Sequence, residues 1–478
     1  MSTRPMSTRP IRPATIGQLR AAGYADRTVK EELRENLLAR LHRRDPLFPT
    51  LIGFDDSVLP GLERGILAGH DLILLGERGQ AKTRLVRHLA DLLDEEIPAI
   101  EGCEVNDHPY RPICARCRER VALEGDDVPI AWVDRDRRYA EKLATPDISV
   151  ADLIGDVDPI RVAEGRYLVD ELTIHYGLIP RTNRGIVAIN ELPDLPERIQ
   201  VALFNILEER DVQIRGYRIR LPLDLLLVAT ANPEDYTHRG RIVSPLKDRF
   251  GTQVRTHYPE TLGDEIVIMD QEAHRPAGQV PVRVAAFMKE ILAALTAELR
   301  RSPQINQRSG VSVRYSIGNL ETLSAAAVRR AARAGEQEAV PRVCDLPAAL
   351  DSSLGRVEFD TIEEGREGDI LLRALRNAEL EVFRRRLAGF DFQPILSRFS
   401  EGFTAESSDV MAAGEFLGQF GDLPGLAKLL GRLGVEEESP GVAAAALEFA
   451  LEGLHLSRRL NKDQAGRIGT YRYEGVGR

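Results

Sequence analysis

The feature that most constrains this chain is a short glycine-bounded loop between an apolar run and an amphipathic segment. The loop reads Gly76-Glu77-Arg78-Gly79-Gln80-Ala81-Lys82-Thr83. The apolar residues 72–75 are typical of a buried parallel strand, and residues 83–93 carry apolar side chains at helical spacing. A strand, such a loop and a helix in this order predict a phosphate-binding loop, because backbone N–H groups and the helix dipole there attract phosphate oxygens.

Two side chains of this loop have a predicted chemical role. Lys82 would reach the β- and γ-phosphates of a nucleotide, and the Thr83 hydroxyl would ligate Mg²⁺. The pattern G-x-x-x-x-G-K-[ST] has glycine where this chain has Ala81. The extra methyl group of alanine lies where the backbone approaches phosphate, and alanine disfavours a positive φ. Both effects predict weaker nucleotide binding. The alternative interpretation is a strand–helix turn with a surface lysine.

A second apolar run, residues 186–189, ends in Asn190-Glu191. An ATPase needs at such a strand end one group that holds Mg²⁺ through water and one carboxylate that polarises the attacking water. Glu191 suits the second role. Asn190 stands where aspartate is usual and carries no charge, so we expect weaker Mg²⁺ affinity, slower hydrolysis or both. The alternative is a solvated Asn-Glu pair.

A third apolar run, residues 225–229, is followed by Thr230-Ala231-Asn232-Pro233. Asn232 at this strand end would hydrogen-bond the attacking water or the γ-phosphate. By itself an Asn-Pro pair indicates only a turn. The prediction for Asn232 depends on its order in the chain, because Asn232 follows both the phosphate-binding loop and the strand that ends in Asn190-Glu191.

The order of elements predicts an α/β fold with a parallel sheet covered by helices on both faces. Two hairpin-like segments, 160–171 and 211–221, interrupt the alternation, and the chain becomes Ala-rich and helical after residue 259. We expect the following segments: a disordered tail (1–15), a helical segment (16–48), the α/β core (49–260) with an insert (101–128), a helical region (261–350), a linker (351–368), a C-terminal helical domain (369–465) and a tail (466–478).

Charge and composition exclude several classes of protein. The net charge is −10, which disfavours nucleic acid and anionic membrane surfaces as partners. No apolar run reaches the roughly 18 residues that a membrane span needs, and the first residues lack the apolar stretch of a secretory signal. Four cysteines in 478 residues argue against a disulfide scaffold, so we expect a cytoplasmic protein.

Four candidate metal ligands cluster in the insert: Cys103, His108, Cys114 and Cys117. Cys114 and Cys117 have the spacing of a zinc knuckle, and His108 or Cys103 would complete a tetrahedral, structural Zn²⁺ site. Several arginines nearby favour thiolates. Reduced buried cysteines and a redox pair are the alternatives.

Taken together, the motifs resemble the AAA+ ATPases of the magnesium chelatase I-subunit and MoxR group. The resemblance runs from about Pro49 to about Ala334. Besides the loop and the two strand ends, it rests on Leu51-Ile52-Gly53, Leu153-Ile154-Gly155-Asp156, Gly177-Leu178-Ile179-Pro180, Arg184-Gly185 and Pro245-Leu246-Lys247-Asp248-Arg249-Phe250-Gly251. It implies a P-loop NTPase core followed by an α-helical lid. Ala81 and Asn190 depart from the group's pattern.

The resemblance also implies roles for individual residues. Ile52 and Gly53 would contact the adenine, and Asn232 would be the sensor asparagine. Arg249 would be an arginine finger that reaches the γ-phosphate in a neighbouring subunit of a homo-oligomeric ring, and the expected ring is a hexamer. Arg314 would be the lid's sensor arginine. The alternatives are an ion pair of Arg249 with Asp248 or Glu191, and a surface position for Arg314.

The resemblance implies a motor that uses ATP and Mg²⁺ to remodel or activate a partner protein, in this group often one with a von Willebrand A domain. Magnesium insertion into a porphyrin is the narrower version. A sigma-factor-dependent transcription activator is a different class, but the Gly-Ala-Phe-Thr-Gly-Ala hexapeptide of those ATPases is absent from the sequence. A slow or non-hydrolysing assembly scaffold is the third hypothesis, motivated by Ala81 and Asn190.

Overall fold

A computed structural model describes residues 12–157, 174–209, 212–214, 217–219, 221–232, 242–274, 280–307, 309–351, 353–360, 365–435, 439–465 and 468–473. The chain forms two compact units. Unit 1 comprises Met1–Gly76 and Ala81–Thr256, and unit 2 comprises Glu77–Gln80 and His257–Arg478. The hairpin predicted at 160–171 lies outside the described residues.

Unit 1 is built on a five-stranded sheet of order β11-β1-β10-β7-β4, in which all neighbouring strands are parallel. The three apolar runs of the sequence form its fully buried centre, whereas the edge strands are only partly buried. The strands are β1 (Leu72–Leu75), β4 (Tyr139–Leu143), β7 (Gly185–Asn190), β10 (Leu225–Ala231) and β11 (Thr252–Arg255). The predicted α/β fold is therefore confirmed.

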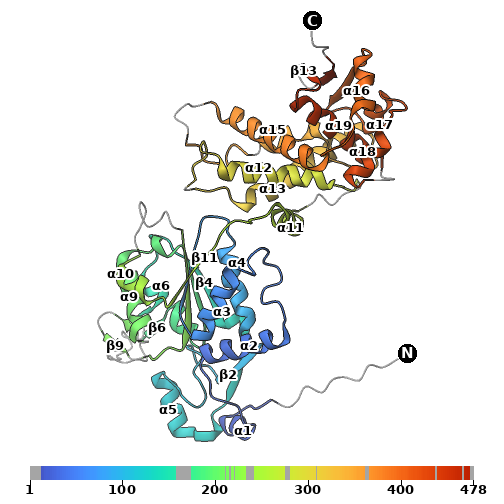
Figure 1. Ribbon diagram of the computed structural model, residues 1–478. Helices are drawn as coiled ribbons and strands as arrows, with labels where there is room; N and C mark the ends of the chain where they lie inside the picture. Colours follow the sequence, from blue (N-terminus) through green and yellow to red (C-terminus); the bar gives the residue numbers. More distant parts are fainter. Residues whose placement is uncertain are drawn as a thin grey trace, which may run out of the picture. The chain divides into compact units, whose positions relative to one another are not determined.

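Side chains alternate between the two faces of this sheet and pack into two separate cores. Leu72, Leu74 and Ile186 join one cluster, and Ile73 and Val187 join the other. Figure 1 shows helices on both faces. The first cluster includes residues of α2 (Val29–Arg43), α3 (Val58–Ala68) and α4 (Lys82–Leu89), and the second includes residues of α9 (Glu197–Glu209) and α10 (Ser244–Arg249).

The N-terminal helical segment is divided into α1 (Ile16–Ala21) and α2. At the start of α2, Thr28 and Glu31 form the capping box that their spacing predicts. The chain around α1 pairs with residues far along the sequence: the Ile130 backbone N–H donates to the Ala14 carbonyl over 2.9 Å, and the Trp132 indole donates to the Pro13 carbonyl over 3.2 Å. The start of unit 1 is thus fastened to the segment that follows the insert.

Unit 1 also contains shorter helices and strands outside the five-stranded sheet. The insert lies between two antiparallel strands and contains one helix: β2 (Glu96–Ile100), α5 (Ala115–Glu124) and β3 (Ile130–Asp134). The hairpin predicted at 211–221 is present, with β8 (Val212–Ile214) antiparallel to β9 (Tyr217–Ile219). The remaining short elements are α6 (Val150–Leu153), β5 (Gly155–Val157), β6 (Ile174–Tyr176) and α8 (Leu178–Arg181), with β5 antiparallel to β6.

Unit 2 is mainly helical, with one three-stranded antiparallel sheet of order β12-β14-β13. Its elements are α11 (Leu262–Glu272), α12 (Ala286–Arg301), α13 (Val313–Ala334), α14 (Pro347–Asp351), α15 (Glu367–Arg386), α16 (Gln393–Ser400), β12 (Ala405–Ser408), α17 (Ala413–Gly418), α18 (Leu426–Leu433), α19 (Pro440–Leu456), β13 (Asn461–Ala465) and β14 (Ile468–Arg472).

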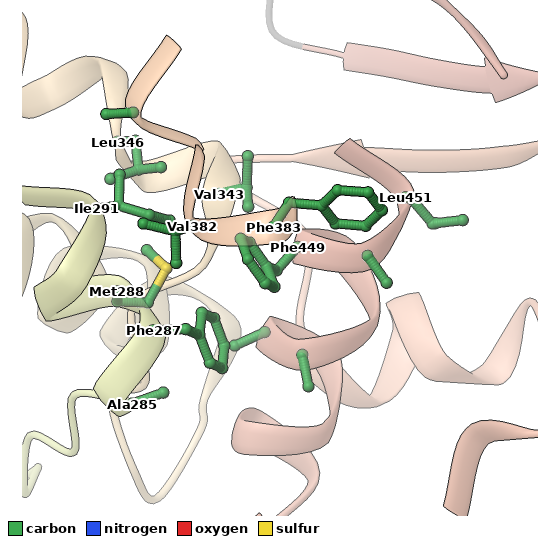
Figure 2. Packing of buried hydrophobic residues seen from close by; sticks show 14 of the residues in the cluster. Ala285, Phe287, Met288, Ile291, Val343, Leu346, Val382, Phe383, Phe449 and Leu451 are labelled. Carbon is green, nitrogen blue, oxygen red and sulfur yellow. The ribbon is translucent and has the colours of Figure 1, made fainter. Parts of the chain in front are cut away.

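One large hydrophobic core extends through most of unit 2. It extends from Met269 on α11 to Tyr471 on β14. At its centre, Phe287 of α12 stacks on Phe449 of α19 with ring centroids 4.7 Å apart, and Phe383 of α15 packs edge-on against the same ring (Figure 2). Three helices distant in sequence thus meet around Phe449.

This shared core changes two expectations about the chain's organisation. The segment 351–368 was expected to link separate domains, but the residues on either side of it belong to one core, and Phe359 pairs with Ile305 in an isolated bridge. The expected tail at 466–478 contains β14, whose Tyr471 is fully buried. Period-two burial on such a short, polar strand gives too weak a sequence signal to separate it from a tail.

Unit 2 also buries an arginine. Arg342 is fully inaccessible and donates to the Glu448 carboxylate over 2.7 Å, to the Met411 carbonyl over 3.0 Å and to the Ser407 hydroxyl over 3.2 Å. Its guanidinium also lies 4.7 Å from the centroid of the Phe416 ring. These contacts join the segment before α14 to α19 and to β12.

Candidate nucleotide site

The predicted phosphate loop connects β1 to α4, as its sequence context requires. Gly79 and Ala81 both adopt the left-handed conformation, with φ of 77° and 55°. Ala81 is also the N-cap of α4 and provides no side-chain cap. A left-handed alanine costs roughly 1–2 kcal/mol relative to a right-handed conformation. The departure from glycine at this position is therefore a strained one.

Lys82 begins α4 and points back over the loop. Its buried Nζ donates to the Gly76 carbonyl and, over 2.7 Å, to Oδ1 of Asn232 at the end of β10. The sequence predicted separate roles for this lysine and this asparagine, and the structure brings them into direct contact. Thr83, the next residue of α4, is half-buried.

The end of β7 holds the two other predicted residues. Glu191 has a φ of 57°, and its backbone N–H donates to the Thr230 hydroxyl over 3.1 Å. The same hydroxyl lies 3.3 Å from Oδ1 of Asn190. Thr230 on β10 therefore connects the strand end of β7 to the strand that carries Asn232.

Glu141 on β4 belongs to this site, although no motif in the sequence singles it out. Asn190 Nδ2 donates to Glu141 Oε1 over 2.7 Å. Arg87, one helical turn after Thr83, donates to both carboxylate oxygens over 2.7 and 3.0 Å, and the Tyr139 hydroxyl donates over 3.1 Å. Burial opposes ionisation of Glu141, but these hydrogen bonds outweigh it and lower its pKa.

Glu141 escaped prediction for a physical reason. Its strand reads Tyr-Ala-Glu-Lys-Leu and lies at the edge of the sheet, where partial exposure permits polar residues. The sequence signal that was present is the wide separation between the first helix and the acidic strand, which leaves room for another strand. That signal identifies no particular residue.

Arg249 ends α10 and pairs within its own chain. Its Nη1 lies 2.5 Å from Oε2 of Glu208 on α9, and its guanidinium lies 5.4 Å from the centroid of the Phe204 ring. The alternative ion pair, with Asp248 or Glu191, is replaced by this one. Because 45% of the Arg249 side chain is exposed, the group is accessible at the surface of unit 1.

Arg314 and Ile52 occupy different surroundings. In unit 2, Arg314 lines a cavity of about 550 Å³ together with Arg78, Ser312 and Arg356. In unit 1, the predicted adenine contacts Ile52 and Gly53 are half-buried, and Gly53 has a φ of 78°. Arg314 therefore shares a cavity with one residue of the phosphate loop, Arg78.

The cysteine cluster of the insert differs from its prediction in one ligand. Cys103, Cys114 and Cys117 lie together, but the fourth group beside them is Asp107 rather than His108. The His108 ring accepts a hydrogen bond at Nδ1 from the Tyr110 backbone, and its Nε2 lies 3.4 Å from Asp26. Burial and the neighbouring Arg184 lower the pKa of His108 to about 4. The spacing of the sequence could not distinguish two adjacent candidate ligands.

Parts of the chain are similar to known proteins. A family model described as an AAA domain of the dynein-related subfamily matches residues 131–250. The chain is 28% identical over 207 residues to a magnesium-chelatase subunit ChlI homolog of Methanocaldococcus jannaschii, covering 41% of this chain and 51% of that protein. It is 26% identical over 208 residues to the magnesium-chelatase subunit ChlI of Anabaena variabilis, covering 42% and 57%. The chain thus spans about half the length of these curated relatives.

Solved structures align more loosely. A chain from a complex between the subunits BchI and BchD of magnesium chelatase aligns over 68% of this chain and 98% of its own length, at 21% identity and a TM-score of 0.35. NtrX from Brucella abortus in complex with ATP aligns over 80% of this chain and 70% of its own length, at 17% identity and a TM-score of 0.41.

In the described part of the chain, no helix is long and apolar enough to cross a bilayer.

The segment that matches the AAA model includes β7, β10 and α10. Asn190 and Arg249 end β7 and α10, and Glu191 and Asn232 directly follow β7 and β10. The curated matches extend the similarity over about two fifths of the chain. The chain is therefore similar to the AAA+ ATPases of the magnesium chelatase I type.

Proposed function

We propose that this protein binds ATP with Mg²⁺, hydrolyses it slowly, and uses the cycle to remodel or activate a partner protein. The observation that carries the proposal is the 2.7 Å contact between Lys82 and Asn232. It joins the phosphate loop after β1 to the end of β10. Asn190 ends the next strand, β7, and Glu191 directly follows it. Ligands of open α/β sheets bind at the carboxyl ends of such strands.

In the proposed reaction, the loop's backbone N–H groups and Lys82 bind the phosphates. Thr83, and Asn190 through water, would hold Mg²⁺, which neutralises charge on the phosphate oxygens when bound. Glu191 takes a proton from the attacking water, and Asn232 orients that water or the γ-phosphate. Glu141 contributes the negative charge that Asn190 lacks, because the two side chains are hydrogen-bonded.

We further propose that Arg249 acts in trans within a ring, with six subunits as the expected number. To reach a neighbour's γ-phosphate, Arg249 must leave Glu208. The cost is small, because ion pairs at this level of exposure contribute about 0–1 kcal/mol. An arginine finger can contribute about 10³–10⁵-fold in rate, so assembly would control hydrolysis. Arg314 would add a lid contact to the nucleotide.

The partner is proposed to be a client or co-subunit protein, and a von Willebrand A domain is the specific type to test. The family resemblance to the chelatase I and MoxR group supports this choice. Insertion of magnesium into a porphyrin is the narrower form of the proposal. We propose that the protein acts in the cytoplasm, because four cysteines in 478 residues argue against the disulfide scaffold of a secreted protein.

A second candidate function is an ATP-dependent scaffold that hydrolyses very little. Two observations favour it: the Asn190 amide is uncharged and held by Glu141, and Ala81 is strained in the loop. Both features would slow hydrolysis more than they would prevent binding.

Steady-state ATP hydrolysis measured against protein concentration separates the two functions. For the motor, turnover per subunit rises with concentration and falls at least 100-fold in Lys82→Ala and in Arg249→Ala, while Arg249→Ala still binds ATP. Glu208→Gln is the matched control, because it frees Arg249 without removing it. ATP binding without turnover at any concentration would exclude the motor and support the scaffold.

A further inference from the structure

The strongest site outside the nucleotide region is the cysteine cluster of the insert. One ligand atom from each of Cys103, Asp107, Cys114 and Cys117 lies within 4.8 Å of all the others. Asp107, Cys114 and Cys117 are buried, and Cys103 is half-buried. Tetrahedral Zn²⁺, with bonds of about 2.3 Å to sulfur and about 2.0 Å to oxygen, needs ligand separations of roughly 3.5–3.8 Å. Small side-chain rotations are enough to reach that geometry.

We propose that these residues form a structural Zn²⁺ site with three thiolate ligands and one Asp107 carboxylate oxygen. Three sulfur atoms and one oxygen fill a tetrahedron, so the metal keeps no open position for a substrate. His108 is outside this set, because its ring is turned toward Tyr110 and Asp26.

Backbone N–H groups already hold the ligands in place. The Asp107 N–H donates to Cys103 Sγ, and the Cys117 N–H donates to Cys114 Sγ, both over 3.4 Å. The Ile113 and Cys114 N–H groups donate to the two Asp107 oxygens over 3.1 Å each. Such outer contacts orient metal ligands and stabilise their charge. Each sulfur and oxygen keeps a further lone pair for a metal.

The position of the cysteines on α5 supports thiolates. Cys114 is the N-cap of this ten-residue helix, and Cys117 lies in its first turn. The positive end of the helix dipole favours negative charge on both sulfur atoms. Cys103, Cys114 and Cys117 form no disulfide in the structure, so their sulfur atoms can act as metal ligands.

The buried carboxylate distinguishes a metal site from a redox pair. Asp107 is fully inaccessible, and in the described part of the chain no lysine or arginine forms an ion pair with it. An uncompensated buried carboxylate is strongly destabilising. A disulfide between Cys114 and Cys117 would leave that charge unpaired, whereas a divalent cation compensates it.

The metal would hold the insert against the sheet. Asn183 Nδ2 donates to the Val105 carbonyl over 3.0 Å, and Asn106 Nδ2 donates to the Arg181 carbonyl over 2.9 Å. Residues 105 and 106 lie between the first ligand and Asp107, and residue 183 comes just before β7. The ligand loop is thus attached to the segment that leads into β7, the strand that ends at Asn190.

The test is metal analysis of the purified, reduced full-length chain, followed by exchange of the metal for Co²⁺. We expect one Zn²⁺ per chain and, with Co²⁺, the intense visible absorption and sulfur-to-metal charge-transfer bands of a tetrahedral thiolate site. These measurements use no ATP, so their outcome is independent of the proposed hydrolysis. They also use the unsubstituted protein, so they do not depend on whether a variant folds.

Variants then identify the ligands. Asp107→Ala should weaken Zn²⁺ binding by 10-fold or more, and Cys114→Ser should abolish it. His108→Ala, the adjacent matched control, and Cys344→Ser, the cysteine outside the cluster, should keep one Zn²⁺ and an unchanged Co²⁺ spectrum. A reduced chain that binds no Zn²⁺ overturns the site. Loss of Zn²⁺ in His108→Ala with retention in Asp107→Ala overturns the ligand set.

Discussion

Asn190 at the end of β7 donates a hydrogen bond to Glu141 on the neighbouring strand β4, over 2.7 Å between Nδ2 and Oε1. Asn190 is buried, and Arg87 holds the other side of the same carboxylate. An amide and a carboxylate on two strands thus occupy the place where a single aspartate was expected. This arrangement has consequences for stability, metal affinity and catalysis.

Introducing an aspartate at position 190 should destabilise the protein in the absence of nucleotide. In Asn190→Asp, a donor facing Glu141 becomes a second negative charge, so the free energy of unfolding should fall by about 1–3 kcal/mol. Mg²⁺-ATP should recover the loss, because the cation compensates the added charge. Chemical denaturation with and without Mg²⁺-ATP measures both effects. Asn377→Asp, the same change at an exposed amide that donates to Glu298, should change little.

Removing the Glu141 charge should weaken the binding of Mg²⁺ rather than the binding of ATP. In Glu141→Gln, the Mg²⁺ concentration for half-maximal ATP hydrolysis should rise about 10-fold, as for other groups that act on a metal through its ligands. ATP affinity without Mg²⁺ should remain within about twofold. An unchanged Mg²⁺ requirement would show that Glu141 only pairs with Arg87.

The strain at Ala81 predicts opposite effects of the same substitution at two alanines. Ala81→Gly removes a left-handed penalty of roughly 1–2 kcal/mol and adds an unfolded-state entropy cost of about 0.5–1 kcal/mol, so stability should stay equal or rise by up to about 1 kcal/mol. Ala90→Gly, where φ is −61°, relieves nothing and should destabilise. Denaturation midpoints of the two variants test this, and equal losses would contradict it.

Breaking the buried pair of Arg342 and Glu448 should destabilise unit 2 strongly. Arg342→Met leaves Glu448 buried without its cation, which costs about 3–5 kcal/mol. The double variant Arg342→Met/Glu448→Leu removes both charges and should recover most of the loss. Denaturation of the two single variants and the double variant gives the coupling energy. Additive losses would mean that the two groups act independently.

Glu379 predicts a pH dependence of unit 2. Burial, and then the charge of Glu452, raise the pKa of Glu379 well above its ordinary value of 4.5. The folded state therefore retains a proton that the unfolded state releases, so this group's contribution to stability is complete below 4.5 and declines as pH rises toward the folded pKa. Lys462 and Arg376 oppose the shift, and Glu448 adds to it.

Glu379→Gln should remove this contribution. Between about pH 5 and pH 8, the free energy of unfolding should decline less in the variant than in the original protein. Glu381→Gln, on the same helix but exposed, is the matched control. The same slope in all three proteins would rule out Glu379 as the source.

The sequence predicted the centre of the fold better than its edges. β1, β7 and β10 are continuous apolar runs because both of their faces are covered, so their order and the residues that follow them were readable. β4 is polar because it lies at the sheet edge, and Glu141 was therefore missed. β14 was missed because its one fully buried side chain, Tyr471, gives no periodic signal over five residues.

Side-chain choices within a motif were less predictable than the motif itself. The zinc-knuckle spacing pointed to the insert, but only the turn of the backbone decides that Asp107 rather than His108 faces the cysteines. The alternative considered for Arg249, an ion pair with Asp248 or Glu191, named the wrong acidic partner: the side chain pairs with Glu208, because the position of α9 against α10 depends on tertiary packing.

The fastening of the N-terminal segment has a consequence for biosynthesis. The indole of Trp132 binds a carbonyl 119 residues earlier, at Pro13. At translation rates of about 5–20 residues per second, the ribosome adds Trp132 roughly 6–24 s after it adds Pro13. Until then α1 has no surface on which to pack, and its apolar side chains are available to chaperones.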